Sequence, residues 1–377
     1  MRIAHIANFY GPTSGGLRTA MHALGAGYLG RGHQMLLIVP GADDEDENTP
    51  YGRRVTIKAP IVPGTGGYRV ILRTARVRRA LREFAPDVLE VSDRTTLRGI
   101  GRWARQRGIP SVFFSHERAD GILRANLPRT LSRVLPVEAL ADWHNRVTAR
   151  RFTTVVCTTD FARAEFERAG LRAEKIPLGV DLERFTPANY GADVRAQFAR
   201  ADEALVFMAS RLSTEKQPEL AIDAIRVLVE RGRALRLVSA GTGNMDAAMR
   251  ARAADLPVTF LGFVTDRALF AQLLASADVV VAPGPIETFG LAALEALASG
   301  TPVVVNASSA LPEVVADAGV AAAGTAGAFA DGIEEVLTWD ENARRRSARE
   351  RAETMPWSAT VDALVALHTA AISAAPS

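Results

Sequence analysis

Residues 282–302 read APGPIETFGLAALEALASGTP. The apolar run that ends at residue 282 is typical of a buried strand, and residues 291–298 have the composition of a helix. Glu287 precedes this helix, and Glu295 lies eight positions later, about two turns in at roughly 3.6 residues per turn. A glutamate in an otherwise apolar helix is costly to bury unless it is paired or binds a ligand. The stretch predicts a strand, a ligand-binding loop and a helix, with two carboxylates directed at different parts of one elongated ligand.

Outside this stretch, short strand candidates alternate with helix candidates along the chain. In the second half, strands are expected at 205–209, 235–240, 258–261, 279–282 and 302–306, and helices at 218–231, 245–254, 267–275, 291–298, 311–316 and 326–337. In the first half, strands are expected at 2–7, 35–39, 55–58, 88–91, 111–115 and 154–158, and helices at 17–31, 68–84, 96–107 and 161–169. This alternation predicts the α/β class, with parallel sheets covered by helices on both faces.

The chain of 377 residues is long enough for two domains, each with its own core. The segment 177–187, PLGVDLERFTP, is bounded by prolines and lacks periodicity, as interdomain linkers do. We therefore predict an N-terminal Rossmann-like domain over 1–178 and a C-terminal one over 179–356. An amphipathic helix within 357–377 is expected to cross back to the first domain.

The composition excludes several classes of protein. No stretch approaches the roughly 18 consecutive apolar residues of a membrane span, and residues 1–10 lack the apolar core and cleavage site of a signal peptide. Cys157 is the only cysteine, which excludes a disulfide framework and a thiolate metal cluster. We expect a cytoplasmic protein with no nucleic-acid partner.

Charge is distributed unequally along the chain. Residues 1–175 contain 28 Lys and Arg against 17 Asp and Glu, a net charge of +11, and the remainder contains 17 against 25, a net charge of −8. The asymmetry favours two domains with different partners. The acidic run Asp43–Glu47 is expected to be a solvated loop, and no metal site is predicted. Lysine is scarce, because only Lys58, Lys175 and Lys216 are present.

Two loops have the residues of a phosphate site. Arg211 and Lys216, in SRLSTEKQP at 210–218, lie before a predicted helix, and two cations at a helix N-terminus suit a pyrophosphate. A pair of surface cations is the alternative. Residues 11–16, GPTSGG, follow the first strand, where glycines let a ligand approach the backbone. A tight strand-to-helix turn is the alternative there, and the GxGxxG fingerprint is not matched.

Together, these motifs resemble those of family-4 retaining glycosyltransferases of the GT-B fold, in which two Rossmann-like domains have parallel sheets that face each other across a cleft. The resemblance rests on the two glutamates with seven residues between them, on Arg211 and Lys216, on the Gly-Gly loop and on His116 in FFSHE after a strand. It covers essentially the whole chain. It implies that the second domain binds most of a nucleotide-sugar donor and that the first domain binds the acceptor.

The resemblance also implies a role for each matching residue. Arg211 and Lys216 would bind the diphosphate, Glu287 the hydroxyls of the transferred sugar and Glu295 the ribose. His116 would lie near the reacting carbon, although alone it would be interpreted as a loop or core histidine. The remaining donor-binding candidates are Gly15, Gly16, Gly241, Phe263, Val264, Thr288, Phe289, Gly290 and Leu291.

A closer resemblance is to actinobacterial mannosyltransferases that act on phosphatidylinositol dimannoside. It rests on ANFYGPTSGGLRTA, LEVSDRTTLRGIGRW, SHERAD, VVCTTDFARAEF and the stretch 282–302. It implies retaining transfer of an α-mannosyl group from GDP-mannose to a glycolipid or glycoside hydroxyl. No cofactor and no obligatory Mg²⁺ are expected, because protein cations and helix dipoles would meet the charge of the departing diphosphate.

Other functions remain as alternatives. A UDP-sugar-dependent transferase with a soluble or antibiotic-type acceptor fits the same motifs, because relatives change donor and acceptor through a few loop residues. A nucleotide-sugar epimerase would turn over the donor without an acceptor. An NAD dehydrogenase fits the α/β pattern, but the nearest fingerprint, GTGNMD at 241–246, lacks the third glycine.

The segment 68–84, YRVILRTARVRRALREF, carries six arginines within fourteen positions and is predicted to be a basic amphipathic helix. Such a helix can lie on an anionic membrane surface, here the inner face of the plasma membrane, with each cation contributing about 1 kcal/mol. An ordinary surface helix is the alternative. The candidates for acceptor or membrane contact are Tyr10, Arg69, Arg76, Arg78 and Arg79.

Overall fold

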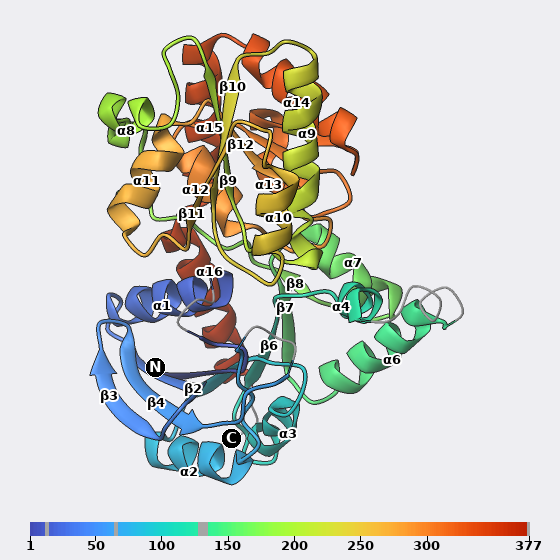
Figure 1. Cartoon of the computed structure of the whole chain (residues 1–377). Coiled ribbons are helices and arrows are strands. Elements are labelled where there is room, and N and C mark those ends of the chain that lie inside the picture. The colour runs from blue at the N-terminus through green and yellow to red at the C-terminus, as the bar shows by residue number, and fades with distance from the viewer. Residues whose placement is uncertain (12–14, 64–66, 127–134, 375–377) are drawn as a thin grey trace. The chain divides into compact units, whose positions relative to one another are not determined.

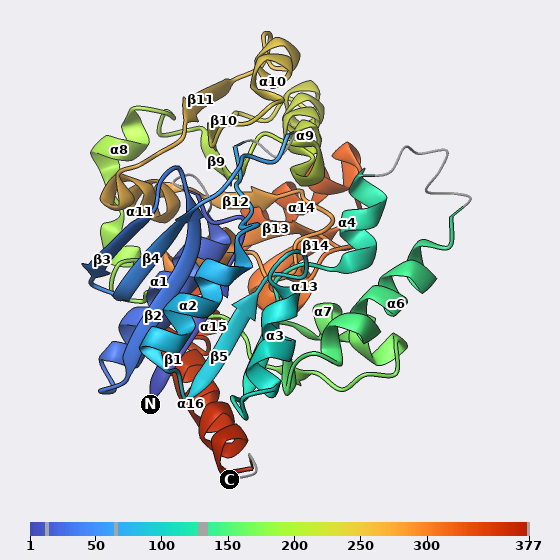
Figure 2. The same ribbon diagram turned by 90° about the horizontal axis from the view of Figure 1, so that it is seen from below.

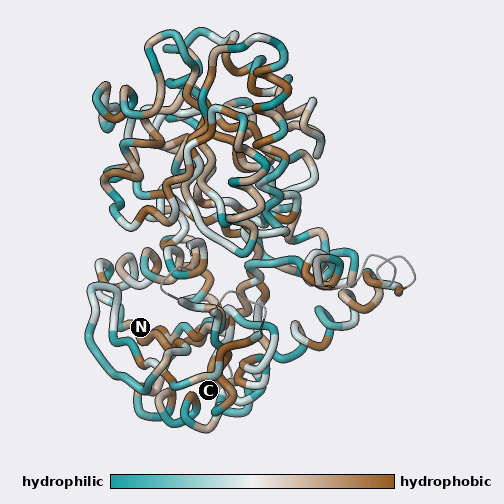
Figure 3. Tube along the Cα trace, viewed as in Figure 1, coloured by the Kyte–Doolittle hydropathy of each residue, from teal (hydrophilic) through white to brown (hydrophobic). Residues whose placement is uncertain are grey.

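The computed structural model describes residues 1–11, 15–63, 67–126 and 135–374. The chain forms two compact units (Figure 1). Unit 1 comprises Met1–Leu178 together with Trp357–Ser377, and unit 2 comprises Gly179–Pro356. In both, hydrophobic segments run along the interior strands, and hydrophilic segments gather in the outer helices and loops (Figure 3).

Unit 1 is built on a sheet in the order β3-β4-β2-β1-β5-β6-β7-β8. All neighbouring strands pair in parallel except β3 and β4. The strands are β1 (Arg2–Ala7), β2 (Gln34–Gly41), β3 (Glu45–Thr49), β4 (Gly52–Lys58), β5 (Val88–Ser92), β6 (Ser111–Ser115), β7 (Thr154–Cys157) and β8 (Glu174–Lys175).

Helices cover both faces of this sheet, because successive side chains of a strand point to opposite faces. Ile3 and Ala7 belong to the core formed with α1 (Gly16–Leu29) and α16 (Trp357–Ser373). Ala4 and Ile6 belong to the core formed with α2 (Thr74–Phe84), α3 (Arg98–Arg105) and α7 (Asp160–Arg168). Helices α4 (Ala119–Asn126) and α6 (Val137–Ala149) pack against each other. Figure 2 shows α2 and α3 in front of the strands of unit 1.

Unit 2 has an all-parallel sheet in the order β11-β10-β9-β12-β13-β14. Its strands are β9 (Ala204–Ala209), β10 (Leu235–Ala240), β11 (Val258–Gly262), β12 (Val279–Ala282), β13 (Val303–Asn306) and β14 (Gly319–Ala322). The order reverses between β9 and β12, and in such sheets ligands bind beyond the carboxyl ends of the strands at this reversal.

The helices of unit 2 also form two layers. One layer, α9 (Pro218–Glu230), α10 (Asp246–Arg252) and α14 (Ala326–Thr338), shares a core with the side chains of Val206 and Met208 in β9. On the other face, Phe207 contacts Phe270 of α11 (Arg267–Ser276). The other helices are α8 (Ala192–Ala196), α12 (Leu291–Ala298), α13 (Leu311–Val315) and α15 (Glu341–Glu353).

The α/β alternation predicted from the sequence is confirmed, but three expectations are corrected. The acidic run at 43–47 is not a loop throughout, because residues from Glu45 onward form edge strand β3, in which Asp46 and Glu47 pair with Arg53 and Arg54 of β4. The basic helix α2 begins only at Thr74. The sequence interpretation also missed β8, β14, α4, α6, α8 and α15.

No helix in residues 1–11, 15–63, 67–126 and 135–374 has the length and apolar character needed to span a bilayer. Cys157 is buried at the end of β7, and this burial raises the pKa of its thiol to about 12. It therefore behaves as a small hydrophobic residue of the core.

Candidate active site

The loop after β9 positions the two predicted cations. Residues Thr214–Lys216 form a short 3-10 helix just before Pro218 begins α9. Arg211 Nη2 lies 3.0 Å from Glu215 Oε1. Burial alone would raise the pKa of Glu215, but a bond from the Ser213 hydroxyl and the charges of Arg211 and Lys216 lower it. The structure thus brings both cations close to one carboxylate.

Glu287 lies in the loop after β12, on the other side of the strand-order reversal. Its Oε1 forms an ion pair with Lys216 Nζ, and both side chains are mostly buried. The loop is held in place because the Ala310 amide donates to the Glu287 carbonyl at 2.9 Å. The ion pair therefore joins the two loops that flank the reversal point, and it places an anion where the resemblance expects a diphosphate to meet Lys216.

The start of α12 needs a glycine. Gly290 caps the helix with φ of 79°, in the left-handed region that favours glycine. A Cβ there would lie 2.2 Å from Leu311 Cδ2. Phe289 is buried beside it, and Thr288 and Leu291 are half-buried. The backbone at 288–291 is thus fixed by packing as well as by the helix start.

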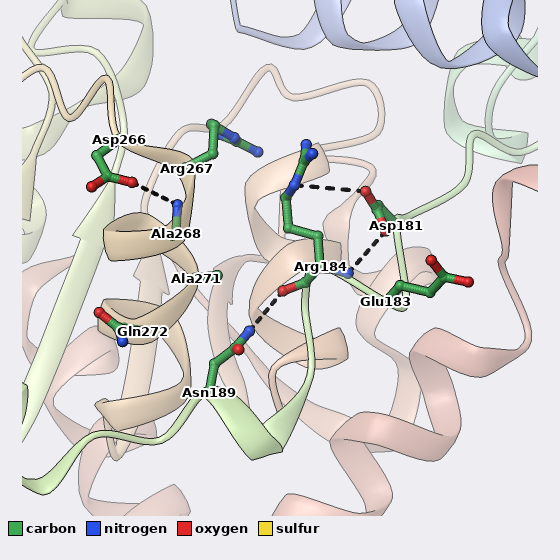
Figure 4. A pocket seen from close by; sticks show the side chains of 9 residues that line it. All are labelled: Asp181, Glu183, Arg184, Asn189, Asp266, Arg267, Ala268, Ala271 and Gln272. Carbon is green, nitrogen blue, oxygen red and sulfur yellow. Dashed lines mark hydrogen bonds and ion pairs between the residues drawn. The ribbon is translucent and has the colours of Figure 1, made fainter.

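Glu295 lies inside α12 and is 7% exposed. Burial raises the pKa of its carboxyl, although Arg267 opposes the shift and donates from Nη2 to Oε1 at 2.7 Å. Arg267 is the first residue of α11. It also lines a pocket of about 630 Å³ with Asp181, Glu183, Arg184, Asn189, Asp266, Ala268, Ala271 and Gln272 (Figure 4). A charged pocket thus opens beside the glutamate predicted to bind ribose.

The other donor-binding candidates of unit 2 lie at the ends of β10 and β11. Gly241 follows β10 with φ of 145°, and a Cβ there would lie 1.9 Å from the Ser210 carbonyl oxygen. Glycine is therefore required for the loops after β9 and β10 to meet. Phe263 and Val264 follow β11, where Phe263 is 44% exposed and Val264 is half-buried. An exposed ring in this position offers a surface on which a base can stack.

In unit 1, Gly15 caps α1 and Gly16 is its first residue. A Cβ added to either would meet no described atom within 4 Å. Packing within the described chain therefore does not explain these glycines, and backbone N–H groups at a helix start suit an anion. The rest of the predicted loop, residues 12–14, lies outside the described residues.

His116 follows β6, and its Nε2 lies 2.8 Å from Ser92 Oγ at the end of β5. Removal from water lowers the pKa of His116 to about 3, with smaller contributions from His5 and Arg94. The imidazole is therefore neutral at physiological pH. It can accept or donate a hydrogen bond, and it carries no charge of its own.

Two family models match the chain, one for each half. The "Glycosyl transferase 4-like domain" matches residues 15–179, and "Glycosyl transferases group 1" matches residues 192–355. A relative from Mycobacterium tuberculosis is 47% identical over 97% of this chain and 95% of its own length. That protein is called a GDP-mannose-dependent alpha-(1-6)-phosphatidylinositol dimannoside mannosyltransferase. The chain belongs to the family-4 glycosyltransferases.

Other comparisons agree with this family. A GDP-mannose-dependent alpha-mannosyltransferase of Mycobacterium tuberculosis is 29% identical, and the match covers 81% of this chain and 78% of the relative's own length. Among solved structures, sucrose-phosphate synthase from Thermosynechococcus elongatus has a TM-score of 0.79 at 22% identity and 99% coverage of both chains. WaaG, a glycosyltransferase involved in lipopolysaccharide biosynthesis, has a TM-score of 0.74 at 20% identity and covers 97% of this chain and 99% of its own. These structures confirm the GT-B fold.

Two acceptor candidates of the glycosyltransferase already have partners. Tyr10 is only 9% exposed, and its hydroxyl lies 2.6 Å from His22 Nε2. Arg69 Nη1 donates to the Ala59 carbonyl at 2.6 Å. To contact an acceptor, either side chain must bind it in addition to its present hydrogen-bond partner or give up that partner.

The basic helix of the glycosyltransferase differs from the expectation. Val77 and Leu81 are fully buried in the core of unit 1, so the apolar face of α2 is not available to a membrane. Arg73 and Arg76 pair with Asp44, which lies just before edge strand β3. Arg79 pairs with Glu83, and Arg78 donates to Thr74. The exposed face nevertheless remains rich in arginine.

Sequence reasoning missed Arg267 and Glu215. Arg267 follows the helix-capping Asp266, and Asp-Arg before an apolar helical run was a usable signal for a charged residue at a helix start. Glu215 lies between the two predicted cations, yet nothing in the sequence indicates which of them it pairs with. Both residues matter because Arg267 pairs with Glu295 and Glu215 pairs with Arg211.

Proposed function

We propose that the enzyme transfers an α-mannosyl group from GDP-mannose to a hydroxyl of a phosphatidylinositol-mannoside glycolipid, with retention of configuration and without a metal ion. The observation that carries this proposal is the 47% identity, over nearly the full length of both chains, to the mycobacterial dimannoside mannosyltransferase. The ion pair between the loops after β9 and β12 supports a donor site at the strand-order reversal of unit 2.

Different residues of unit 2 bind different parts of the donor. Lys216 and Arg211 bind the diphosphate and stabilise the charge that grows on it as it departs. Glu287 accepts hydrogen bonds from the mannose hydroxyls, and Glu295 accepts them from the ribose. Phe263 and Val264 contact the base, and the backbone around Thr288–Leu291 contacts the phosphate and sugar. Lys216 exchanges its bond to Glu287 for one to the diphosphate when the donor binds.

The reaction breaks the bond from the anomeric carbon to the phosphate oxygen and forms one to the acceptor oxygen on the same face. The departing diphosphate takes the proton of the acceptor hydroxyl. His116 is neutral, as its lowered pKa indicates, and therefore stabilises the positively charged sugar by its dipole instead of acting as an acid. The N-terminal end of α1 at Gly15 and Gly16 contacts the donor phosphate.

We further propose that unit 1 contacts an anionic membrane surface. The side chains of Arg73, Arg76 and Arg79 are 44%, 42% and 68% exposed. Because the apolar face of α2 is buried, the attraction is mainly electrostatic. Leu72 and Ile61, which are 62% and 52% exposed, supply apolar contact beside it. The enzyme would then act at the inner face of the plasma membrane.

A ligand screen and a product assay test the donor and the acceptor separately. Only a ligand of the native state raises the melting temperature, so GDP-mannose and GDP should raise it more than UDP-glucose or UDP-GlcNAc. Incubation with labelled GDP-mannose and phosphatidylinositol dimannoside should yield a labelled glycolipid whose new linkage is α. A larger shift with UDP-sugars would support the soluble-acceptor alternative, and donor turnover without acceptor would support an epimerase.

A further inference from the structure

A continuous chain of short polar contacts connects His116 with a buried carboxylate in unit 1. His116 Nε2 lies 2.8 Å from Ser92 Oγ, and Ser92 Oγ lies 2.7 Å from His5 Nε2. His5 Nδ1 in turn lies 2.9 Å from Glu90 Oε2. His5 and Glu90 are fully buried, and Ser92 is 8% exposed.

Strand register explains how these residues meet. His5 of β1 lies directly opposite Glu90 of β5, and Ala7 lies opposite Ser92. Because side chains alternate along a strand, Glu90 and Ser92 point to the same face of the sheet. Phe114 of β6 belongs to the core on this face and stacks on both His5 and His116. The contacts are therefore built into the sheet and do not depend on a surface loop.

Two helices complete the surroundings of Glu90. The Tyr28 hydroxyl of α1 donates to Oε1 at 2.6 Å, and His368 Nε2 of α16 lies 2.8 Å from the same oxygen. Burial alone would raise the pKa of Glu90, but the contacts with His5 and His368 outweigh it and hold the pKa well below its usual range. Tyr28 and His368 bond to Oε1, and His5 lies 2.9 Å from Oε2, so these three groups stabilise the ionised carboxylate.

An ionised carboxylate only accepts hydrogen bonds, so with a neutral His5 ring the proton positions follow one from the next along the chain of contacts. His5 must carry its proton on Nδ1, which faces Glu90. In a neutral ring, His5 Nε2 is then an acceptor, and the Ser92 hydroxyl donates to it. Ser92 Oγ has its lone pairs left for His116, so His116 donates from Nε2.

We infer that Glu90, His5 and Ser92 are positioning residues that hold His116 as the neutral ring with its proton on Nε2 and a lone pair on Nδ1. This inference rests on the proposed role of His116 near the reacting carbon. A ring in this form has a lone pair, not a proton, on the nitrogen that does not contact Ser92. The other charged or titratable groups near this chain of contacts are Arg94, Tyr28 and His368.

The role of α16 follows from the same contacts. This helix comes after unit 2 in the sequence, but it belongs to unit 1 (Figure 2). Its His368 Nε2 lies 2.8 Å from Glu90 Oε1. Thr360 of the same helix donates to the Pro177 carbonyl at 2.9 Å. Thr360→Val therefore weakens the attachment of α16 without touching Glu90, which makes it a matched control.

Nitrogen NMR of the full-length protein with labelled histidine tests the proton positions, because protonated and unprotonated ring nitrogens have distinct shifts. The chain has six histidines, so each is assigned by its own substitution. In the wild type, we expect the His116 proton on Nε2. In Glu90→Gln, the amide NH₂ faces His5 Nδ1, so His5 and then His116 should each move their proton to the other nitrogen. Thr360→Val should leave both rings unchanged.

Kinetics give a second readout. Glu90→Gln and Ser92→Ala should lower kcat about tenfold to a hundredfold with little change in the donor KM, the range known for hydrogen-bond partners that orient metal-binding side chains. Ser92→Thr, which keeps a hydroxyl, should restore most of the loss. Ser92→Ala removes only one oxygen atom, so it can be used for the kinetic test if Glu90→Gln does not fold.

Three results would overturn the inference: a wild-type His116 with its proton on Nδ1, the same His116 form in Glu90→Gln as in the wild type, or near-wild-type kcat in folded Ser92→Ala. The NMR result does not need turnover. If GDP-mannose and phosphatidylinositol dimannoside gave no product, this would count against the proposed function. The NMR measurement would still show where the histidine protons lie.

Discussion

Lys216 Nζ and Glu287 Oε1 form an ion pair between the loops after β9 and β12, on either side of the point where the strand order of unit 2 reverses. The pair joins the cation that we assign to the diphosphate with the carboxylate that we assign to the sugar. We expect a bound donor to compete with Glu287 for Lys216. The energetic cost is limited, because the phosphate replaces one anion at Lys216 with another.

Removing either cation should impair catalysis strongly. We expect Lys216→Ala and Arg211→Ala each to lower kcat/KM by about 10²-fold or more, equivalent to roughly 3 kcal/mol of lost charge stabilisation. Steady-state kinetics with GDP-mannose measure this. Arg226→Ala is the matched control, since Arg226 pairs with Asp255 at the surface of the same unit. Near-wild-type values in both site variants would remove the diphosphate assignment.

The two glutamates should behave differently. Glu287→Gln breaks the ion pair and frees Lys216, so GDP should bind as well as before or more tightly, whereas sugar transfer should fall. Glu295→Gln should weaken GDP itself, because the ribose loses its charged acceptor. Calorimetry with GDP, together with turnover rates, compares the two. If Glu295→Gln bound GDP normally and Glu287→Gln did not, the roles would have to be exchanged.

Stability should fall in mild acid because folded histidines resist protonation. Burial lowers the pKa of His144 to about 4, with help from Arg94 and Arg98. Between about pH 6.5 and 4 the unfolded chain binds a proton at this residue and the folded chain does not, so stability decreases as pH falls through this window. The Tm should therefore drop between pH 7.5 and 5.

A substitution isolates the contribution of His144. His144→Gln should make the fall of Tm with pH shallower, because one of the resisting groups is gone. His33→Gln is the control, since His33 lies in a more exposed part of unit 1. An identical pH dependence in wild type and His144→Gln would contradict this account.

Liposome binding should depend on the balance between α2 and Asp44. Changing Arg76, Arg78 and Arg79 together to Gln should reduce co-sedimentation with phosphatidylinositol-containing liposomes, and salt should reduce it further. Asp44→Asn should increase binding, because it releases Arg73 and Arg76 from their ion pairs. Binding that is absent at low salt, or unaffected by both variants, would favour a soluble acceptor.

Removal of divalent metals should leave the rate unchanged. Arg211, Lys216 and the helix starts are expected to carry the charge of the leaving diphosphate, so a chelator has nothing to remove. Activity measured with an excess of EDTA, and again after adding Mg²⁺, tests this. If EDTA lowered the rate and Mg²⁺ restored it, a metal ion would help Arg211 and Lys216 to stabilise the leaving diphosphate.

Local patterns identified most of the strands and helices of both units. They succeeded because buried parallel strands are short continuous apolar runs, and these are visible without knowledge of the fold. They failed where neighbours decide the structure. Segment 45–49 is acidic enough to be a loop, yet it is a strand because Arg53 and Arg54 lie across from it. Val70 and Ile71 continue the apolar pattern of α2, but they precede the helix and are buried.

The sequence by itself determined the fold class and the family, and it predicted which residues bind the donor, because these depend on residue type and on spacing along the chain. Only the tertiary structure decided the partners of those residues. Lys216 and Glu287 are 71 positions apart, and His368 and Glu90 are 278 apart. No local pattern relates such positions, because their contacts arise from the order of strands in the sheet and from the return of α16 to unit 1.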